Sequence, residues 1–358
     1  MITVSGAIHI LKKDHILIGR NVRKKIFAAV TAAAVAAVAV LVAASLREEN
    51  ASDASLTPVT LNEVAHSVFY APQYAAIELG YFEDEGIALT LVNGAGADKV
   101  MTSLISGDAD IGFMGSEASI YVYQEGSDDY AVNFAQLTQR AGNFLVGRTP
   151  EDDFSWQDLR GKKVLGGRAG GMPQMVFEYI LKKNGIDPAK DLTIDQSIDF
   201  GLTAAAFTSS DADYTVEFEP FATGLELEGN GYVIASLGKD SGYVPYTAYS
   251  AKKSYLEQNP QIIQSFTNAI QKGLQYVNSH SAEEIAQTIK PQFPETDLAA
   301  VTKIVQRYKD QDTWKNDTVF EEESFDLLQN ILEEAGELNE RVPYEKLVTT
   351  EFSQKAAK

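Results

Sequence analysis

Aromatic rings and carboxylates occur at points where the sequence predicts that a strand gives way to a helix. This set comprises Phe69, Tyr70, Glu117, Glu217, Glu219 and Tyr246. Rings stack on flat apolar groups, and carboxylates accept hydrogen bonds from N–H groups or pair with protonated nitrogens. Free backbone N–H groups at the helix starts converge on the same crevice. The combination favours a site for a nitrogen-containing heterocycle such as a pyrimidine.

A second group of residues favours a negatively charged ligand. Residues 166–173 (GGRAGGMP) precede a predicted helix, so their backbone N–H groups are suited to an anion such as a sulfonate. Arg168 would add positive charge, and Gly170, Gly171 and Met172 would line the turn. A surface ion pair is an equally good interpretation of Arg168. Because carboxylates in a cleft repel anions, the heterocycle is favoured, and a sulfonate, taurine or nitrate ligand is the alternative.

Two polar side chains complete the predicted ligand contacts. Gln73 stands at the start of a predicted helix, and Ser116 follows a short apolar strand. Ser116 is equally suited to cap the helix that begins at Glu117. For one member of the pair Glu217 and Glu219, we favour a solvated acid at a helix start over a ligand contact.

The composition argues against several classes of function. The chain has no cysteine, which excludes disulfides, thiolate nucleophiles, cysteine zinc sites and iron–sulfur clusters. His66 and His280 stand far apart, and no Gly-x-Ser-x-Gly nucleophile motif is present. We therefore predict no catalytic residue, no metal ligand and no cofactor. The formal net charge of −20 disfavours nucleic acid and anionic lipid as partners.

The opening of the predicted fold is a βαβ unit within residues 61–92. An apolar run over residues 64–70 predicts a strand, residues 73–79 predict a helix that ends at Gly80, and residues 87–92 predict a second strand. In such a unit, ligands collect where the strand ends and the helix begins. The predicted contacts near residue 70 lie at that point. The glycine-rich turn over residues 93–97 predicts a plain loop.

Four motifs along the chain carry a family resemblance. The first is P-x-Y-x-A-x-x-x-G-Y-F-x-x-x-G over residues 72–86, and the second is G-D-A-D-I-x-F-x-G-x-E over residues 107–117. The third is D-L-x-G-K-x-V over residues 158–164, and the fourth is E-P shortly after D-Y-T-V, over residues 213–220. With these motifs, residues 60–350 resemble the solute-binding proteins of sulfonate, taurine and thiamine-pyrimidine ABC transporters.

The resemblance implies an α/β fold of the two-lobe, type II periplasmic-binding-protein class. Each lobe would be a parallel-rich sheet flanked by helices, with two hinge crossings between the lobes. Residues 59–144 and 248–358 would form lobe 1, and residues 145–247 would form lobe 2. In this family, the loop that follows the strand of the second motif, residues 110–114, touches the ligand.

The same resemblance implies a monomeric receptor that captures a small solute between its lobes. Its partners would be a membrane permease and the cytoplasmic ATPase of that importer. A membrane-tethered sensor domain is an alternative. An enzyme on this fold is disfavoured, because the similar pyrimidine synthase uses a cysteine-rich iron site that this chain cannot build.

The N-terminal residues predict export. Residues 1–25 form a basic leader, and residues 26–46 carry no charge over 21 positions. As a helix, such a run is about 31 Å long, enough to cross the hydrocarbon core of a bilayer. A cleaved signal peptide and a retained anchor both fit, and a polar linker follows over residues 47–58. The preceding basic residues place the body outside the cytoplasm. Without a cysteine, the protein is not a lipoprotein.

Overall fold

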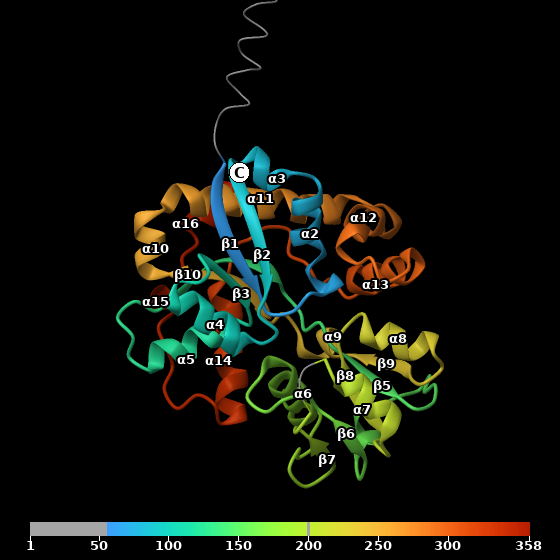
Figure 1. Cartoon of the computed structure of the whole chain (residues 1–358). Helices are drawn as coiled ribbons and strands as arrows, with labels where there is room; N and C mark the ends of the chain where they lie inside the picture. The colour runs from blue at the N-terminus through green and yellow to red at the C-terminus, as the bar shows by residue number, and fades with distance from the viewer. Residues whose placement is uncertain (1–55, 199–200) are drawn as a thin grey trace, which may run out of the picture. The chain divides into compact units, whose positions relative to one another are not determined.

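The computed structural model describes residues 56–198 and 201–358. The predicted leader over residues 1–25, the hydrophobic segment over residues 26–46 and most of the predicted linker lie outside these residues. In the described part of the chain, the strands form two sheets of five strands each, and helices flank both (Figure 1).

The first sheet is built from both early and late segments of the chain. Its strands are β1 (Thr57–Glu63), β2 (Ile87–Asn93), β3 (Ile111–Met114), β4 (Ala131–Thr138) and β10 (Thr247–Lys252). They lie in the order β2-β1-β3-β10-β4. β1 pairs in parallel with β2 and β3, whereas β10 pairs antiparallel with β3 and β4. β3 and β4 are buried along their whole length, which is why their sequences do not alternate between apolar and polar residues.

The second sheet repeats this pattern. Its strands are β5 (Phe144–Gly147), β6 (Lys163–Leu165), β7 (Thr193–Asp195), β8 (Tyr214–Glu217) and β9 (Tyr232–Ser236). They lie in the order β7-β6-β8-β5-β9. β6 pairs in parallel with β7 and β8, and β5 pairs antiparallel with β8 and β9.

The chain crosses between the two sheets twice. The first crossing joins β4 to β5, and the second joins β9 to β10. The chain enters the second sheet through β5 and returns to the first sheet through β10. Each of these strands is fourth in the order of its sheet and pairs antiparallel with both neighbours. β5 begins at Phe144 and β10 at Thr247. The residue boundaries of the lobes given above stay a prediction.

Helices surround both sheets, and we assign those that precede β5 or follow β10 to the first lobe and those between β5 and β10 to the second. Those of the first lobe are η3 (Val68–Tyr70), α2 (Ala71–Glu78), α3 (Tyr81–Asp84), α4 (Ala97–Ser106), α5 (Glu117–Gln124), α10 (Lys253–Gln258), α11 (Pro260–Ser279), α12 (Ala282–Ile289), η5 (Lys290–Gln292), α13 (Leu298–Asp310), α14 (Glu322–Ala335), α15 (Tyr344–Leu347) and α16 (Glu351–Ala356). Those of the second lobe are η4 (Trp156–Leu159), α6 (Met172–Lys183), α7 (Thr203–Ser209), α8 (Phe221–Leu227) and α9 (Leu237–Ser241). Across residues 56–198 and 201–358, no helix has both the length and the apolarity to span a bilayer.

The long helix α11 shows how a periodic sequence becomes core. Ile263, Phe266, Ile270 and Leu274 recur with the spacing of one helix face, and all are buried. The same helix packs against α2, where the carbonyl of Pro72 approaches closely. A Cβ at position 273 would stand 2.2 Å from that oxygen, so glycine is required there. This packing holds the opening unit of the first lobe in place.

The predicted strand over residues 64–70 is wrong. β1 ends at Glu63, and the apolar run continues as the 3-10 turn η3. The side chain of Ser67 accepts a hydrogen bond from the N–H of Phe69, which starts the turn. A short apolar run records burial but does not distinguish a strand from a buried helical turn.

Candidate ligand-binding cleft

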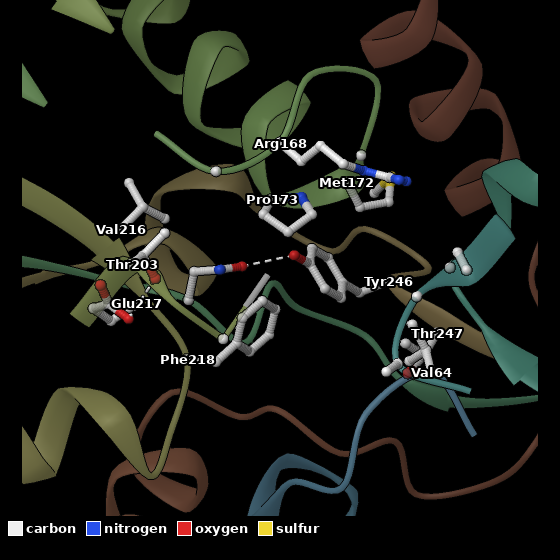
Figure 2. Close-up of a pocket in the computed structure, with 18 of the residues that line it drawn as sticks. Val64, Arg168, Met172, Pro173, Thr203, Val216, Glu217, Phe218, Tyr246 and Thr247 are labelled. Carbon is white, nitrogen blue, oxygen red and sulfur yellow. Dashed lines mark hydrogen bonds between the residues drawn. The ribbon is translucent and has the colours of Figure 1, made fainter. Parts of the chain in front are cut away.

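A cavity of about 420 Å³ lies between the two lobes of the described chain (Figure 2). Its lining follows the C-terminal ends of strands from both sheets. Val64 comes after β1, Ala95 after β2 and Gly115 after β3, while Gly167 comes after β6 and Glu217 ends β8. Parallel strands bring these ends to one edge of each sheet, where ligands bind in open α/β folds.

Aromatic side chains form one wall of the cavity. Tyr70, Phe218 and Tyr246 line it, and Phe69 packs behind them with ring centroids 5.7 Å from Tyr246 and 6.0 Å from Phe218. The hydroxyl of Tyr246 donates to Oδ1 of Asn143 at 2.6 Å, the dashed line in Figure 2. Burial raises the pKa of Tyr70 and of Tyr246, so both hydroxyls stay neutral. This wall offers flat apolar surface with polar edges.

Glu117 supplies a buried carboxylate from the first lobe. It begins α5, and its side chain folds back over Gly115, where an added Cβ would meet Oε2 at 2.1 Å. Oε2 is buried without a hydrogen-bond partner among the described residues. Burial raises the pKa of Glu117 to about 7, against the opposing influence of its own backbone N–H and of Arg168. A residue of the cavity lining therefore has a buried acceptor whose hydrogen-bonding capacity is unused by the described residues.

Glu217 supplies a second buried carboxylate, from the second lobe. The hydroxyl of Thr215 donates to Oε1 at 2.6 Å, and that of Thr203 donates to Oε2 at 2.9 Å. Figure 2 shows Thr203 next to Glu217 at the cavity wall. Burial raises the pKa of Glu217 to about 7 despite these two bonds. Glu217 is 1% exposed, so a solvated acid at a helix start is the wrong interpretation for this residue.

Arg168 and the glycine-rich turn stand at the rim. Arg168 lines the cavity and also lies 3.4 Å from Asp98 of the opposite lobe, both side chains being more than half exposed. A surface pair of this kind contributes little to stability. Gly171 caps α6, and Met172 begins it, and both line the cavity. Gly170 adopts the left-handed conformation one residue earlier and is not part of the lining.

Three of the predicted contacts face the protein interior instead. Gln73 is fully buried, donates to Oε2 of Glu63 at 2.7 Å and accepts from the hydroxyl of Tyr249. A buried carboxylate needs donors, and the first turn of α2 supplies them. Phe69 is core behind the aromatic wall. Ser116 stands at the N-cap position of α5, as expected, but its side chain makes no cap bond and instead donates to the carbonyl of Pro245 at 2.5 Å.

Glu219 also lies outside the cavity lining. Its carboxylate accepts from Arg307 on α13 and from the N–H and hydroxyl of Thr223. The side chain of Glu219 is 0% exposed and that of Arg307 is 17% exposed. Neighbouring positions in this segment face opposite ways, so Phe218 borders the cavity and Glu219 turns to the first lobe. A solvated acid is the wrong interpretation here too.

The sequence reasoning missed part of the lining. The additional residues include Val64, Ala95, Gly96, Lys99, Asn143, Thr203 and Phe221. The plain loop predicted over residues 93–97 contributes to the cavity, and it follows a parallel strand as the other contacts do. Its place directly after a parallel strand was the signal that could have identified this loop as part of the cavity. Phe221 has the same signal, since it begins α8 after the parallel strand β8. Asn143 carries no such signal, because it lies on the crossing between the two sheets.

Metal binding has no structural support in residues 56–198 and 201–358, where no three potential His, Asp or Glu ligands group together. His66 hydrogen-bonds through Nδ1 to Oε1 of Glu63 and through Nε2 to the carbonyl of Gln292, both at 2.8 Å. These bonds occupy both ring nitrogens of His66 with protein partners.

Comparison with known proteins identifies the family. The model of the family described as "NMT1/THI5 like" matches residues 68–284. The chain is 46% identical over 301 residues to YtlA of Bacillus subtilis (strain 168), proposed to be a binding protein, with 84% of this chain and 90% of YtlA covered. The chain belongs to the NMT1/THI5-like family.

Solved structures confirm the fold of this family member. The ligand-binding component of an ABC-type import system from Staphylococcus aureus, with zinc bound, matches with a TM-score of 0.68 at 15% identity, covering 84% of this chain and 99% of that one. The periplasmic aliphatic sulphonate-binding protein SsuA from Escherichia coli matches with a TM-score of 0.65 at 16% identity, covering 82% and 97%. The predicted two-lobe periplasmic-binding-protein fold is confirmed.

Proposed function

We propose that this protein is the extracytoplasmic substrate-binding receptor of an ABC importer. Its family membership, the two-lobe fold and a cavity lined from both lobes support this role. A ligand in such a cavity contacts both lobes at once, so binding favours the arrangement in which the lobes close around it. The partners of this proposal are a membrane permease and its ATPase, and the receptor acts as a monomer. The proposed lobe boundaries are residues 59–144 with 248–358, and residues 145–247.

We propose further that the ligand is a flat nitrogen-containing heterocycle with N–H groups. The observation that carries this proposal is the buried, unpaired Oε2 of Glu117 at a cavity with an aromatic wall. An unmade hydrogen bond in a buried site costs free energy, and a ligand N–H removes that cost. A protonated ring nitrogen would gain a charge-assisted bond in addition. Tyr70 and Tyr246 provide faces and edges against which the ring packs.

The alternative of an anionic ligand is supported by residues at the rim of the cavity. Arg168 and Lys99 line the cavity, and Gly171 presents the start of α6, so a sulfonate or nitrate has donors available there. Against it stand the two buried acids, Glu117 and Glu217, which repel an anion when they are ionised. The structure of SsuA noted above is that of a sulphonate-binding protein, and it shares the fold at low identity.

A thermal-shift measurement separates these ligands. The purified protein is heated alone and with the aminopyrimidine precursor of thiamine, riboflavin, taurine or nitrate. A ligand at a hundred times its Kd stabilises the folded state by about 2.7 kcal/mol, which raises the melting temperature measurably. We expect a shift with the aminopyrimidine and none with taurine or nitrate. A shift with taurine or nitrate alone would establish the anionic alternative.

The location of the protein in the cell is part of the proposal. Export follows from the charge pattern of residues 1–46, which lie outside the described residues, and both release and membrane attachment fit it. A reporter fused to the C-terminus should be active only in its exported form. A role in sensing rather than import would leave ligand binding intact, so uptake of radiolabelled ligand in a deletion strain distinguishes the two. We propose binding without catalysis in either case.

A further inference from the structure

The segment that ends β8 faces two sides of the molecule. Val216, Glu217 and Phe218 line the cavity, and Phe221 rejoins it at the start of α8. Between them, Glu219 points to the first lobe. The position of the cavity wall in the second lobe therefore depends on how residue 219 is held.

Glu219 is held by the first lobe through both its side chain and its main chain. The guanidinium of Arg307, on α13, donates through Nη1 to Oε1 of Glu219. The hydroxyl of Ser67, which precedes η3, donates to the carbonyl oxygen of Glu219 at 2.8 Å. The ring of Phe69 then contacts Phe218 from the same lobe. These contacts attach one short segment of the second lobe directly to the first.

Arg307 connects this segment to the body of α8. Its Nη1 also donates to the hydroxyl of Thr223 at 3.0 Å, and its Nη2 donates to Oε2 of Glu226 at 2.8 Å. Lys303, one turn earlier on α13, donates to the same oxygen of Glu226 at 2.8 Å. Two cations from α13 thus face two carboxylates of the second lobe, and the charges balance. Figure 1 shows α13 facing α8 across the boundary between the lobes.

The geometry of the guanidinium explains why arginine is suited to this position. Its planar fork reaches Glu219 and Glu226 with different nitrogens, whereas a lysine ammonium is a single point charge. The buried carboxylate of Glu219 also requires a fixed partner, because an uncompensated buried charge is costly. The guanidinium carbon lies 5.3 Å from the ring centre of Phe144, at the start of β5, which adds a contact beside the first crossing.

We propose that Arg307 is a positioning residue, which fixes residues 216–223 of the second lobe against the first lobe and thereby sets the cavity wall. The positioning role rests on these contacts within the protein and requires no bound ligand. The consequence for affinity rests on the proposed function, since it requires that a ligand binds in the cavity.

Backbone hydrogen exchange tests the positioning without any ligand. The N–H of Thr223 donates to Oε2 of Glu219, and the N–H groups of Ala222 and Gly224 donate to the carbonyls of Phe218 and Pro220. In Arg307→Gln we expect these amides to exchange at least tenfold faster, with β6 unchanged. Arg307→Lys should be intermediate, because lysine can keep one of the two carboxylates.

Arg148→Gln is the matched control. Arg148 follows β5 in the second lobe, stacks on Phe207 at 3.8 Å and donates to the carbonyls of Phe207, Ser210 and Ala212. Its loss should affect α7 and leave the amides near residue 223 as in the parent. Equal exchange in the parent and Arg307→Gln, or the same increase in Arg148→Gln, would overturn the proposal.

A second measurement addresses the ligand. Titration of the aminopyrimidine precursor of thiamine into Arg307→Gln should give a Kd at least tenfold above that of the parent, and Arg148→Gln should bind as the parent does. Faster exchange in Arg307→Gln combined with no binding by the parent would sustain the positioning role and refute the ligand class. Faster exchange with an unchanged Kd would overturn the link between Arg307 and the cavity.

Discussion

Glu117 and Glu219 are both buried where the two lobes meet, yet their surroundings differ. The carboxylate of Glu219 accepts hydrogen bonds from Arg307 and Thr223, so its need for donors is met within the protein. Glu117 lines the cavity, and its Oε2 is buried and unpaired among the described residues. A fully paired buried acid contributes to the architecture, whereas an acid with unused acceptor capacity at a cavity is available to a ligand.

Removing the paired acid should have the largest effect on stability. In Glu219→Ala, the partly buried guanidinium of Arg307 loses one of its two carboxylates. We expect the free energy of unfolding to fall by about 3 kcal/mol, as is typical when one partner of a buried ion pair is removed. Urea denaturation measures this. Glu351→Ala, which removes the exposed partner of Lys355, is the control and should cost about 1 kcal/mol or less.

Removing the charge of the unpaired acid should have the opposite sign. The pKa of Glu117 is raised from 4.5 to about 7 in the folded protein, so its ionisation costs stability as the pH rises through this window. Glu117→Gln should therefore match the parent near pH 4 and be more stable at pH 8, by up to about 3 kcal/mol. Denaturation at several pH values measures the difference.

The same variant tests the ligand. Glu117→Gln should weaken binding of an N–H-bearing heterocycle and leave an anion bound as well as before or better. Calorimetric titration with the aminopyrimidine and with taurine gives both values. A variant of Glu117 that is less stable at pH 8 and binds normally would remove the distinction drawn between the two acids.

Loss of an aromatic face should have a smaller effect on the cavity. Tyr70→Ala removes a ring that lines the cavity, worth on the order of 1 kcal/mol in stacking plus its buried area. We expect Kd to rise by about tenfold or more, since tenfold corresponds to about 1.4 kcal/mol. Tyr123→Ala, on α5, removes a ring that pairs with Tyr130 away from the cavity and should leave Kd unchanged.

The rim should contribute least to a heterocycle site. Arg168→Gln removes an exposed cation that pairs with Asp98 across the cavity mouth. For a heterocyclic ligand, we expect Kd to change by about threefold or less, because exposed pairs contribute under 1 kcal/mol. A much larger loss of affinity in Arg168→Gln, measured with taurine or nitrate, would instead show that the site binds an anion.

Local sequence patterns predicted much of the fold. The helix predicted over residues 73–79 and the strand predicted over residues 87–92 correspond to α2 and β2, because the spacing of apolar residues and the turn at Gly80 are local signals. The predicted strand over residues 64–70 failed because burial, and not pairing, produced its apolar run. The N-terminal predictions lie outside the described residues, and the lobe boundaries stay predictions.

The sequence by itself determined which residues stand at the ends of parallel strands, because hydrophobic spacing and helix-start residues are local properties. Those local properties were enough to include Glu117 and Glu217 among the expected cavity residues, whereas Tyr70 was included through a predicted strand that is in fact the turn η3. Only the tertiary structure decided which way each side chain faces. Phe218 and Glu219 are adjacent in the chain, but one borders the cavity and the other meets Arg307, a partner 88 positions away. Burial, pairing and the raised pKa of an acid all depend on such distant partners, and no local pattern encodes them.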